Sequence, residues 1–72
     1  MPTAAPIFVF QSTYLTYKAE RVLKNGQIAC RLVTKPRHIR SDCGLAIRLE
    51  AEDSTRATAL LAESGVELLG IY

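Results

Sequence analysis

The order of hydrophobic patterns along the chain restricts its fold more than any other feature. Residues 7–10 form a short apolar, β-prone run that is typical of a buried central strand. Segments 28–33 and 44–49 place their larger apolar side chains at every second position, as strands with one buried face do. Residues 66–72 form a last β-prone segment. Because two segments of helical spacing separate these strands, the predicted order is strand, helix, two strands, helix, strand.

Both helical segments carry start and stop signals. In the first, Ser12 or Thr13 is the expected N-cap, and Asn25-Gly26 ends the helix with residues that tolerate a positive φ. Its apolar residues share one face: Leu15, Ala19, Val22 and Leu23. The second has Asp53 or Ser54 as N-cap, an apolar face of Ala57, Leu60 and Leu61, and Gly65 as its end.

This order predicts an α+β fold of the ferredoxin-like βαββαβ type, with a four-stranded antiparallel sheet and both helices on one face. A chain of 72 residues is too short for two cores, so we expect one domain over residues 7–72 after a flexible lead-in of residues 1–6. A right-handed crossover makes the first two strands parallel. The loop 35–43 is therefore expected at the sheet edge where the first helix begins.

The composition excludes several classes of protein. With 49% apolar residues and a net charge of +2, the chain is expected to fold, and its apolar runs are too short to span a membrane. Residues 1–6 have neither the basic residue nor the following apolar stretch of a signal peptide. Two cysteines are fewer than a small disulfide-rich secreted scaffold uses. We therefore expect a cytoplasmic protein with reduced thiols.

Charge is distributed unevenly along the chain. Residues 1–40 hold seven Lys or Arg and one Glu, whereas residues 41–72 hold two Arg and six acidic residues, so balances of +6 and −4 give the net +2. The densest basic stretch contains Arg31, Lys35, Arg37, His38 and Arg40. Two interpretations stay open, a solvated basic loop and a rim that attracts anions.

The candidate site is the segment 37–44, which contains the thiol of Cys43. This thiol is expected near the start of the first helix, where free N–H groups and the helix dipole stabilise an anion and lower a thiol pKa. Basic residues of the loop add positive charge, polar residues shape the turn, and the glycine lets the backbone bend or approach another group closely. The supporting residues are Ser12, Thr13, Arg37, His38, Ser41, Asp42 and Gly44. The alternative interpretation is a half-buried thiol at the end of a strand.

The second thiol, Cys30, is expected to have a structural role. It shares strand parity with Ile28 and Leu32, so it should point into the core. If residues 34 and 44 pair, Cys30 faces about position 48, roughly 16 Å from Cys43 at strand rise. A disulfide needs Cα atoms less than about 7 Å apart, so none is expected.

Metal, cofactor and nucleic acid are not expected as ligands. His38, Asp42 and Cys43 lack a fourth zinc ligand, and the chain has no phosphate-binding glycine loop. RNA-binding domains of this topology stack bases on aromatic residues of the first and third strands. Phe8 and Phe10 lie in the first strand, but the third has no aromatic residue.

The helix-free face of the sheet is predicted to be mixed and fairly apolar. It would carry Ala29, Arg31, Val33, Ala46 and Arg48, with Leu69 and Ile71 if the last strand keeps its phase. Pairing of two such open faces would form a homodimer.

Several motifs give the sequence a resemblance to a known family. They are Phe10-Gln11-Ser12-Thr13, Ala19-Glu20, Leu23-Lys24, Pro36-Arg37, Ser41-Asp42-Cys43-Gly44-Leu45-Ala46-Ile47, Gly65-Val66 and Gly70-Ile71-Tyr72. With them the chain resembles the putative Se/S carrier protein-like family, first catalogued as a domain of unknown function, from about residue 7 to 72. One departure is Arg40, where relatives often have a second serine before Ser41.

The resemblance implies a carrier that holds sulfur or selenium as a persulfide or selenopersulfide on Cys43 and passes it between partner proteins. It implies cysteine desulfurases or proteins of selenophosphate synthesis as those partners. A carrier is favoured over a turnover enzyme, because the chain offers no second obvious catalytic group. The alternative is a non-catalytic binding or regulatory module whose basic loop, residues 35–43, binds an anionic ligand or a partner protein.

Overall fold

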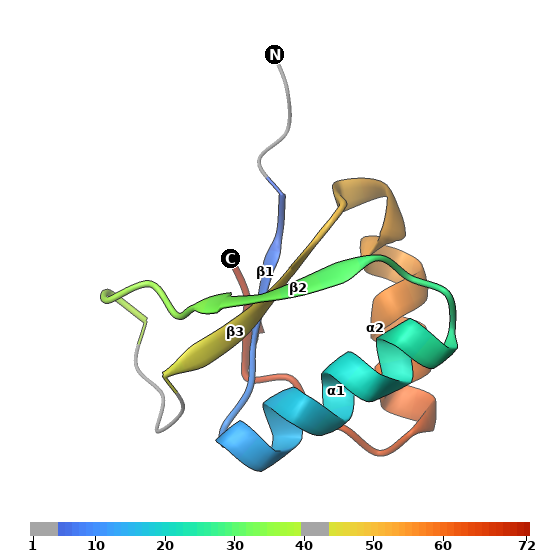
Figure 1. Cartoon of the computed structure of the whole chain (residues 1–72), viewed down its shortest axis with the longest axis horizontal. Helices are drawn as coiled ribbons and strands as arrows, with labels where there is room; N and C mark the ends of the chain where they lie inside the picture. Colours follow the sequence, from blue (N-terminus) through green and yellow to red (C-terminus); the bar gives the residue numbers. More distant parts are fainter. Residues whose placement is uncertain (1–4, 40–43) are drawn as a thin grey trace.

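The structure, a computed structural model, describes residues 5–39 and 44–72 (Figure 1). Their elements follow the predicted order, with a short 3-10 helix added before the second α-helix. In chain order the elements are β1 (Ile7–Val9), α1 (Thr13–Asn25), β2 (Cys30–Thr34), β3 (Leu45–Leu49), η1 (Ala51–Asp53), α2 (Ser54–Glu63) and β4 (Gly70–Ile71).

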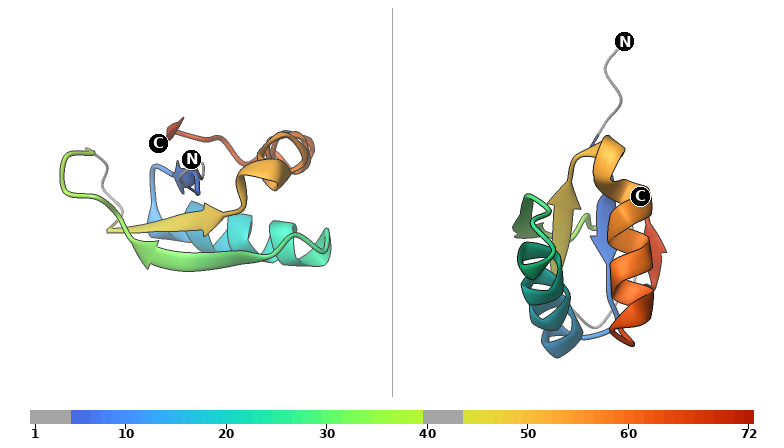
Figure 2. Two further views of the ribbon diagram at one scale, coloured as in Figure 1. Left: turned by 90° about the horizontal axis from the view of Figure 1, so that it is seen from above. Right: turned by 90° about the vertical axis from the view of Figure 1, so that its right-hand side faces the viewer.

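The four strands form one antiparallel sheet in the order β2-β3-β1-β4, which confirms the predicted ferredoxin-like α+β fold. Both helices cover the same face of this sheet, as the right-hand view of Figure 2 shows. β1 and β2 both run antiparallel to β3, so they are parallel to each other, as predicted.

The main core fills the space between the sheet and the two helices. Phe8, Phe10 and Ile47 are fully buried there, and each comes from β1, β3 or the residue that follows β1. The helices contribute Ala19, Leu23, Ala57 and Leu61 from the faces that the helical spacing predicted.

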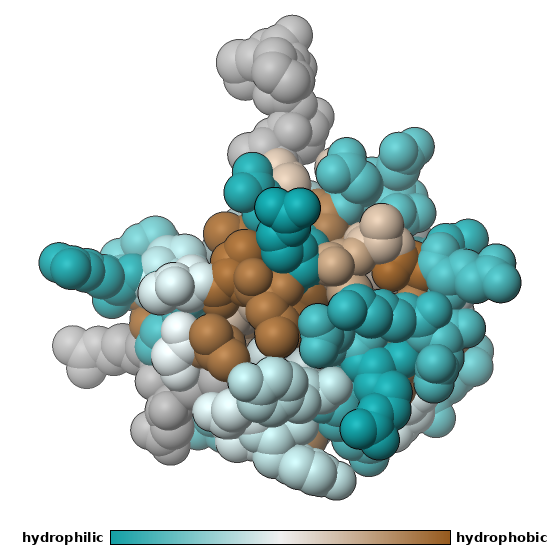
Figure 3. Space-filling model, in the orientation of Figure 1, coloured by the Kyte–Doolittle hydropathy of each residue, from teal (hydrophilic) through white to brown (hydrophobic). Residues whose placement is uncertain are grey.

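The β2–β3 hairpin distributes its side chains between the two faces as the alternation predicted. Cys30 and Leu32 pack against the main core, whereas Arg31 and Arg48 are exposed on the other face. The register is one residue from the expected one, because Thr34 pairs with Leu45. β2 is an edge strand of the sheet. In Figure 3 apolar side chains gather where β2 crosses in front of the other strands.

The start of α1 confirms the predicted N-cap, but its end differs from the prediction. Ser12 has an extended backbone, and its Oγ accepts a hydrogen bond from the Leu15 N–H at 3.2 Å. The residue with positive φ is Gln27, at 62°, whereas Gly26 has a φ of −84°. A side chain at Gly26 would meet Leu60 Cδ1 at 2.5 Å, so close packing of α2 explains this glycine.

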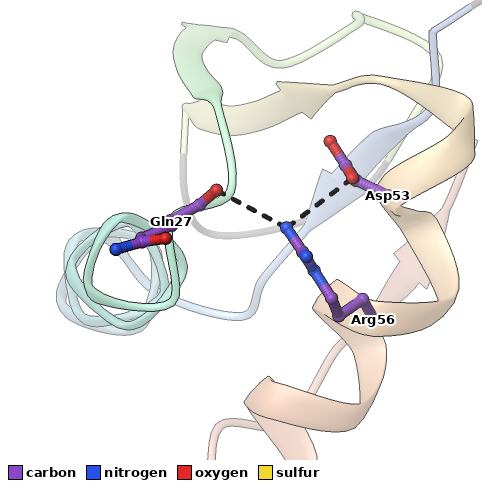
Figure 4. Close-up of polar contacts among 3 residues, drawn as sticks. All are labelled: Gln27, Asp53 and Arg56. Atoms are coloured by element: carbon purple, nitrogen blue, oxygen red, sulfur yellow. Dashed lines mark hydrogen bonds and ion pairs between the residues drawn. The ribbon is translucent and has the colours of Figure 1, made fainter.

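One side chain connects the two helical units at this turn. Arg56 Nη2 donates to the carbonyl oxygen of Gln27 at 3.5 Å and lies 3.8 Å from Asp53 Oδ1 (Figure 4). Asp53 is the residue before α2, as predicted, but it makes no side-chain capping bond. It contacts Arg56 instead, and this exposed contact adds little stability by itself.

The last strand is shorter than the predicted segment 66–72. β4 contains only Gly70 and Ile71, which pair with Val9 and Phe8 of β1. Because Phe8 faces the helices, Ile71 lies on that side of the sheet, so its expected place on the helix-free face was wrong. The ring of Tyr72 covers Gly70, where an added Cβ would lie 2.8 Å from Cε1.

A second, smaller core lies on the helix-free face. Ile39, only 3% exposed, packs with Val9 and Ala46, and Ile7 and Val33 border this cluster. The left-hand view of Figure 2 shows the chain after β2 curling back on the side of the sheet away from the helices. The face that was expected to be open is therefore partly covered by the loop that follows β2.

The turn after α2 depends on glycine at position 65. Gly65 has a φ of 73°, a conformation that costs an L-residue about 1 kcal/mol or more. We expect Gly65→Ala to lower the free energy of unfolding by about 1 kcal/mol in urea denaturation. Gly44→Ala is the matched control, because no described atom lies within 4 Å of an added Cβ at Gly44. Equal losses in both variants would contradict this explanation.

The cluster around Ile39 predicts an unusual cost for a loop substitution. Ile39→Ala should lower the free energy of unfolding by about 2 kcal/mol, since it empties a buried contact with Val9 and Ala46. Ile71→Ala deletes the same atoms at a side chain that is 45% exposed, so its cost should stay below about 1 kcal/mol. The comparison is made by urea denaturation, and a neutral Ile39→Ala would show that the loop is not held by this contact.

Candidate functional site

The sheet topology brings the ends of three segments to one edge. β1 ends at Val9, which pairs with Ala46 near the start of β3, and β2 ends beside that same start. The Lys35 N–H donates to the carbonyl oxygen of Gly44 at 2.9 Å, which closes the β2–β3 connection at its base. As predicted, α1 begins at the edge where the basic loop leaves and re-enters the sheet.

The start of α1 is organised around Ser12. Its carbonyl oxygen accepts bonds from the Thr16 N–H and the Thr16 hydroxyl, each at 3.0 Å, and its own hydroxyl oxygen caps Leu15. Thr13 is the first helical residue and its side chain is exposed. The first N–H groups of any α-helix point out of its N-terminus without helical partners and favour an anion there.

Four residues of the candidate segment 37–44 lie outside the described part of the chain. They are Arg40, Ser41, Asp42 and Cys43. Gly44, the next residue along the chain, is exposed at the start of β3. The predicted close approach to another group is not found among the described residues, because none of their atoms lies within 4 Å of an added Cβ.

Arg37 and His38 occupy a turn on the other side of the sheet from α1. The Ile39 N–H donates to the Pro36 carbonyl oxygen at 3.1 Å, so Arg37 and His38 form the exposed tip of a tight turn. Because Ile39 is buried on the helix-free face, this tip belongs to that side. The structure thus brings Ser12, Thr13 and Gly44 to one edge and directs Arg37 and His38 toward the opposite face.

Ile39 is the residue of this region that the sequence analysis did not single out. It is the one large apolar residue between the basic side chains of the 37–40 segment. An isolated apolar residue in a polar loop is the signal that could have indicated an anchor. Hydrophobic spacing could not predict which way the Ile39 side chain points, because that method applies only within helices and strands.

Cys30 is a free, half-buried thiol at the other end of the hairpin. Burial raises the pKa of the Cys30 thiol, the Glu20 carboxylate raises it further, and Lys24 acts in the opposite direction. Cys30 pairs with Leu49, five residues from Gly44, which is about 17 Å at strand rise. The expected inward orientation of Cys30 is confirmed, although the side chain is not fully covered.

Three further predictions concern nucleic acid, metal ions and membranes. Phe8 and Phe10 are fully buried on the helix side, so neither ring can stack on a nucleic-acid base. Within residues 5–39 and 44–72, no three His, Cys, Asp or Glu side chains are grouped as a metal site would require. In the same ranges, no helix has both the length and the apolar composition to cross a bilayer.

An apolar groove runs beside the start of α1. Its lining includes Leu15 from α1, Ala62 from the end of α2, and Val66 and Leu68 from the segment that leads to β4. Tyr14, 71% exposed, lies in the same first turn of α1 as Leu15. The edge that carries the candidate site thus also carries exposed apolar and aromatic surface.

The raised pKa of Cys30 predicts slow alkylation in the folded protein. At neutral pH a smaller fraction of Cys30 is thiolate in the folded chain than in the unfolded chain, so iodoacetamide should react faster in urea. The stabilisation linked to this shift is present below the unfolded thiol pKa and is lost as the pH rises through the folded one. Peptide mass spectrometry across a pH series measures both rates. Equal rates in the folded and unfolded chains would contradict the shift.

Comparison with known proteins supports one assignment. No curated protein and no solved structure matches the chain. The family described as Putative Se/S carrier protein-like matches residues 5–72, which is nearly the whole chain and includes the described edge and the segment with Cys43. The chain therefore belongs to the Putative Se/S carrier protein-like family.

Proposed function

We propose that this protein carries sulfur or selenium on Cys43, as a persulfide or selenopersulfide, and passes it between partner proteins. The observation that supports this most is the position of Gly44, the neighbour of Cys43, at the sheet edge where α1 begins. The family to which the chain belongs is described as a carrier family, which agrees with such a role.

The proposed loading step is a transfer of one chalcogen atom. The Cys43 thiolate attacks the outer sulfur of a donor persulfide, a new S–S bond forms, and the S–S bond of the donor breaks. The donor leaves as a thiolate, and Cys43 becomes a persulfide. An acceptor nucleophile then attacks the outer sulfur, and Cys43 returns to the thiolate. No external oxidant or reductant is needed in either direction.

The start of α1 supplies the electrostatic support in this proposal. The thiolate and the persulfide anion are both negative at the pH where they react, and a helix N-terminus favours a negative charge. Ser12 uses its hydroxyl oxygen to accept from Leu15, which leaves the hydroxyl hydrogen as the group that donates to an anion.

Arg37 and His38 have a different place in the proposal. Their turn lies on the helix-free side, so we assign them to attraction of an acidic partner surface and not to direct contact with the thiol. Ser41 and Asp42 are assigned to the turn before Cys43. Cysteine desulfurases and proteins of selenophosphate synthesis are the proposed cytoplasmic partners, and a homodimer through the sheet face would have to form around Ile39.

We do not assign the carrying role to Cys30, although it lines a surface depression at the other end of the hairpin. It is half-buried, its pKa is raised by burial, and it packs against the main core. A chalcogen carrier needs a thiolate that is accessible to two different proteins in turn. Cys30 therefore serves as the internal control in a test of Cys43.

The test compares the two cysteines by loading from a small-molecule persulfide. We expect Cys43→Ser to abolish the gain of one sulfur atom measured by intact mass spectrometry, because it removes the attacking thiolate. Cys30→Ser should load at the wild-type rate. Circular dichroism of both variants checks that each is folded.

Two outcomes would contradict a carrier. Equal loading of both single variants would show that the reaction is not specific to Cys43. Unimpaired binding of an anionic ligand or a partner protein by Cys43→Ala, without sulfur loading of the wild type, would favour a non-catalytic binding or regulatory module that uses the basic loop, residues 35–43.

A further inference from the structure

Two arginines face each other on the helix-free side of the sheet. Arg31 of β2 pairs with Arg48 of β3, and Arg48 also pairs with Ile7 of β1. Both arginine side chains are exposed. Directly opposed residues of an antiparallel pair have Cβ atoms about 5 Å apart, so two like charges at these positions repel each other.

Neither arginine is neutralised by an ion pair in the described part of the chain. The ion pairs found there join Lys24 to Glu20 and Arg56 to Asp53, all of them on or next to the helices. Nothing in the fold of the described residues requires two guanidinium groups at this point. No ion pair among the described residues therefore offsets the repulsion between Arg31 and Arg48.

The two arginines border a depression of the surface. Its lining also includes two small residues, Ala5 and Ala29, the acidic residue Glu50, and Cys30 and Leu49. The depression thus combines two guanidinium groups with one acidic group and keeps a positive balance. It lies at the Cys30–Leu49 end of the hairpin, and Gly44 lies at the other end.

We propose that Arg31 and Arg48 form a binding site for a phosphate group, either free or in a small phosphate ester. A guanidinium group presents a planar fork of N–H donors that matches two oxygens of a phosphate, and two forks match a dianion. The bound anion removes the repulsion between the two side chains. This site is separate from Cys43 and does not depend on the carrier function.

The test is a titration of the full chain followed by ¹⁵N NMR, including the arginine side-chain Nε–H signals. Inorganic phosphate and O-phosphoserine are the probes. Serine, which lacks the phosphate group of O-phosphoserine, is the control. We expect shifts at Arg31 and Arg48 that saturate, and Arg31→Gln or Arg48→Gln should each weaken binding about tenfold. Arg21→Gln is the matched control, an exposed arginine on α1, and should bind as the wild type does.

A second measurement separates a binding site from a merely structural pair. Without phosphate, Arg31→Gln should raise the urea midpoint of unfolding, because it removes a like-charge contact. With phosphate, the midpoint of the wild type should rise more than that of the variant.

Saturable binding of either phosphate probe at Arg31 and Arg48, without binding of serine, supports the site. If inorganic phosphate binds more tightly than O-phosphoserine, the ligand is the free ion; if O-phosphoserine binds more tightly, the ligand is a phosphate ester. Equal weakening by Arg21→Gln, or shifts spread over all basic residues, would overturn it, since that pattern indicates general charge attraction. Loss of sulfur loading in Cys43→Ser leaves this site unaffected, so the two proposals can fail separately.

Discussion

Pairing of Phe8 with Ile47 across β1 and β3 is the contact on which the rest of the structure depends. Both side chains are fully buried beneath the helices, and they fix which face of each strand meets α1 and α2. A slip of one residue would turn Val9 and Ala46 toward the helices and expose the phenylalanines. The same β1–β3 register brings Gly44 near the end of β1, whereas the separate β2–β3 register sets Arg31 against Arg48. This apolar pair therefore fixes the sheet edge at which the candidate carrier site lies.

Local patterns in the sequence predicted the elements that depend on local physics. Alternation assigned the faces of β2 and β3, and the hydroxyl of Ser12 marked the start of α1, because capping and strand parity need only near neighbours. The end of α1 was assigned to Gly26 because glycine is the usual left-handed residue, whereas Gln27 takes that conformation and Gly26 makes room for Leu60. That contact lies more than thirty positions away, so no local pattern contains it.

The candidate site was predictable to the extent that it follows from topology. The crossover between β1 and β2 required the basic loop to return to the edge where α1 begins, and it does. The side of the sheet taken by Arg37 and His38 was not predictable, because it follows from burial of Ile39 against two strands distant in sequence.

The contact of Ile39 with the sheet also changes the chain entropy of the region that holds the candidate thiol. Residues 35–44 connect β2 to β3, and this is longer than most hairpin loops. The entropic cost of closing a loop grows with the logarithm of its length. By fixing a residue near the middle of the connection, Ile39 adds a second closure, whose entropic cost the burial of its side chain must offset. A lone isoleucine among basic residues thereby offsets the loss of chain entropy by apolar burial and leaves two short connecting segments in place of one long loop.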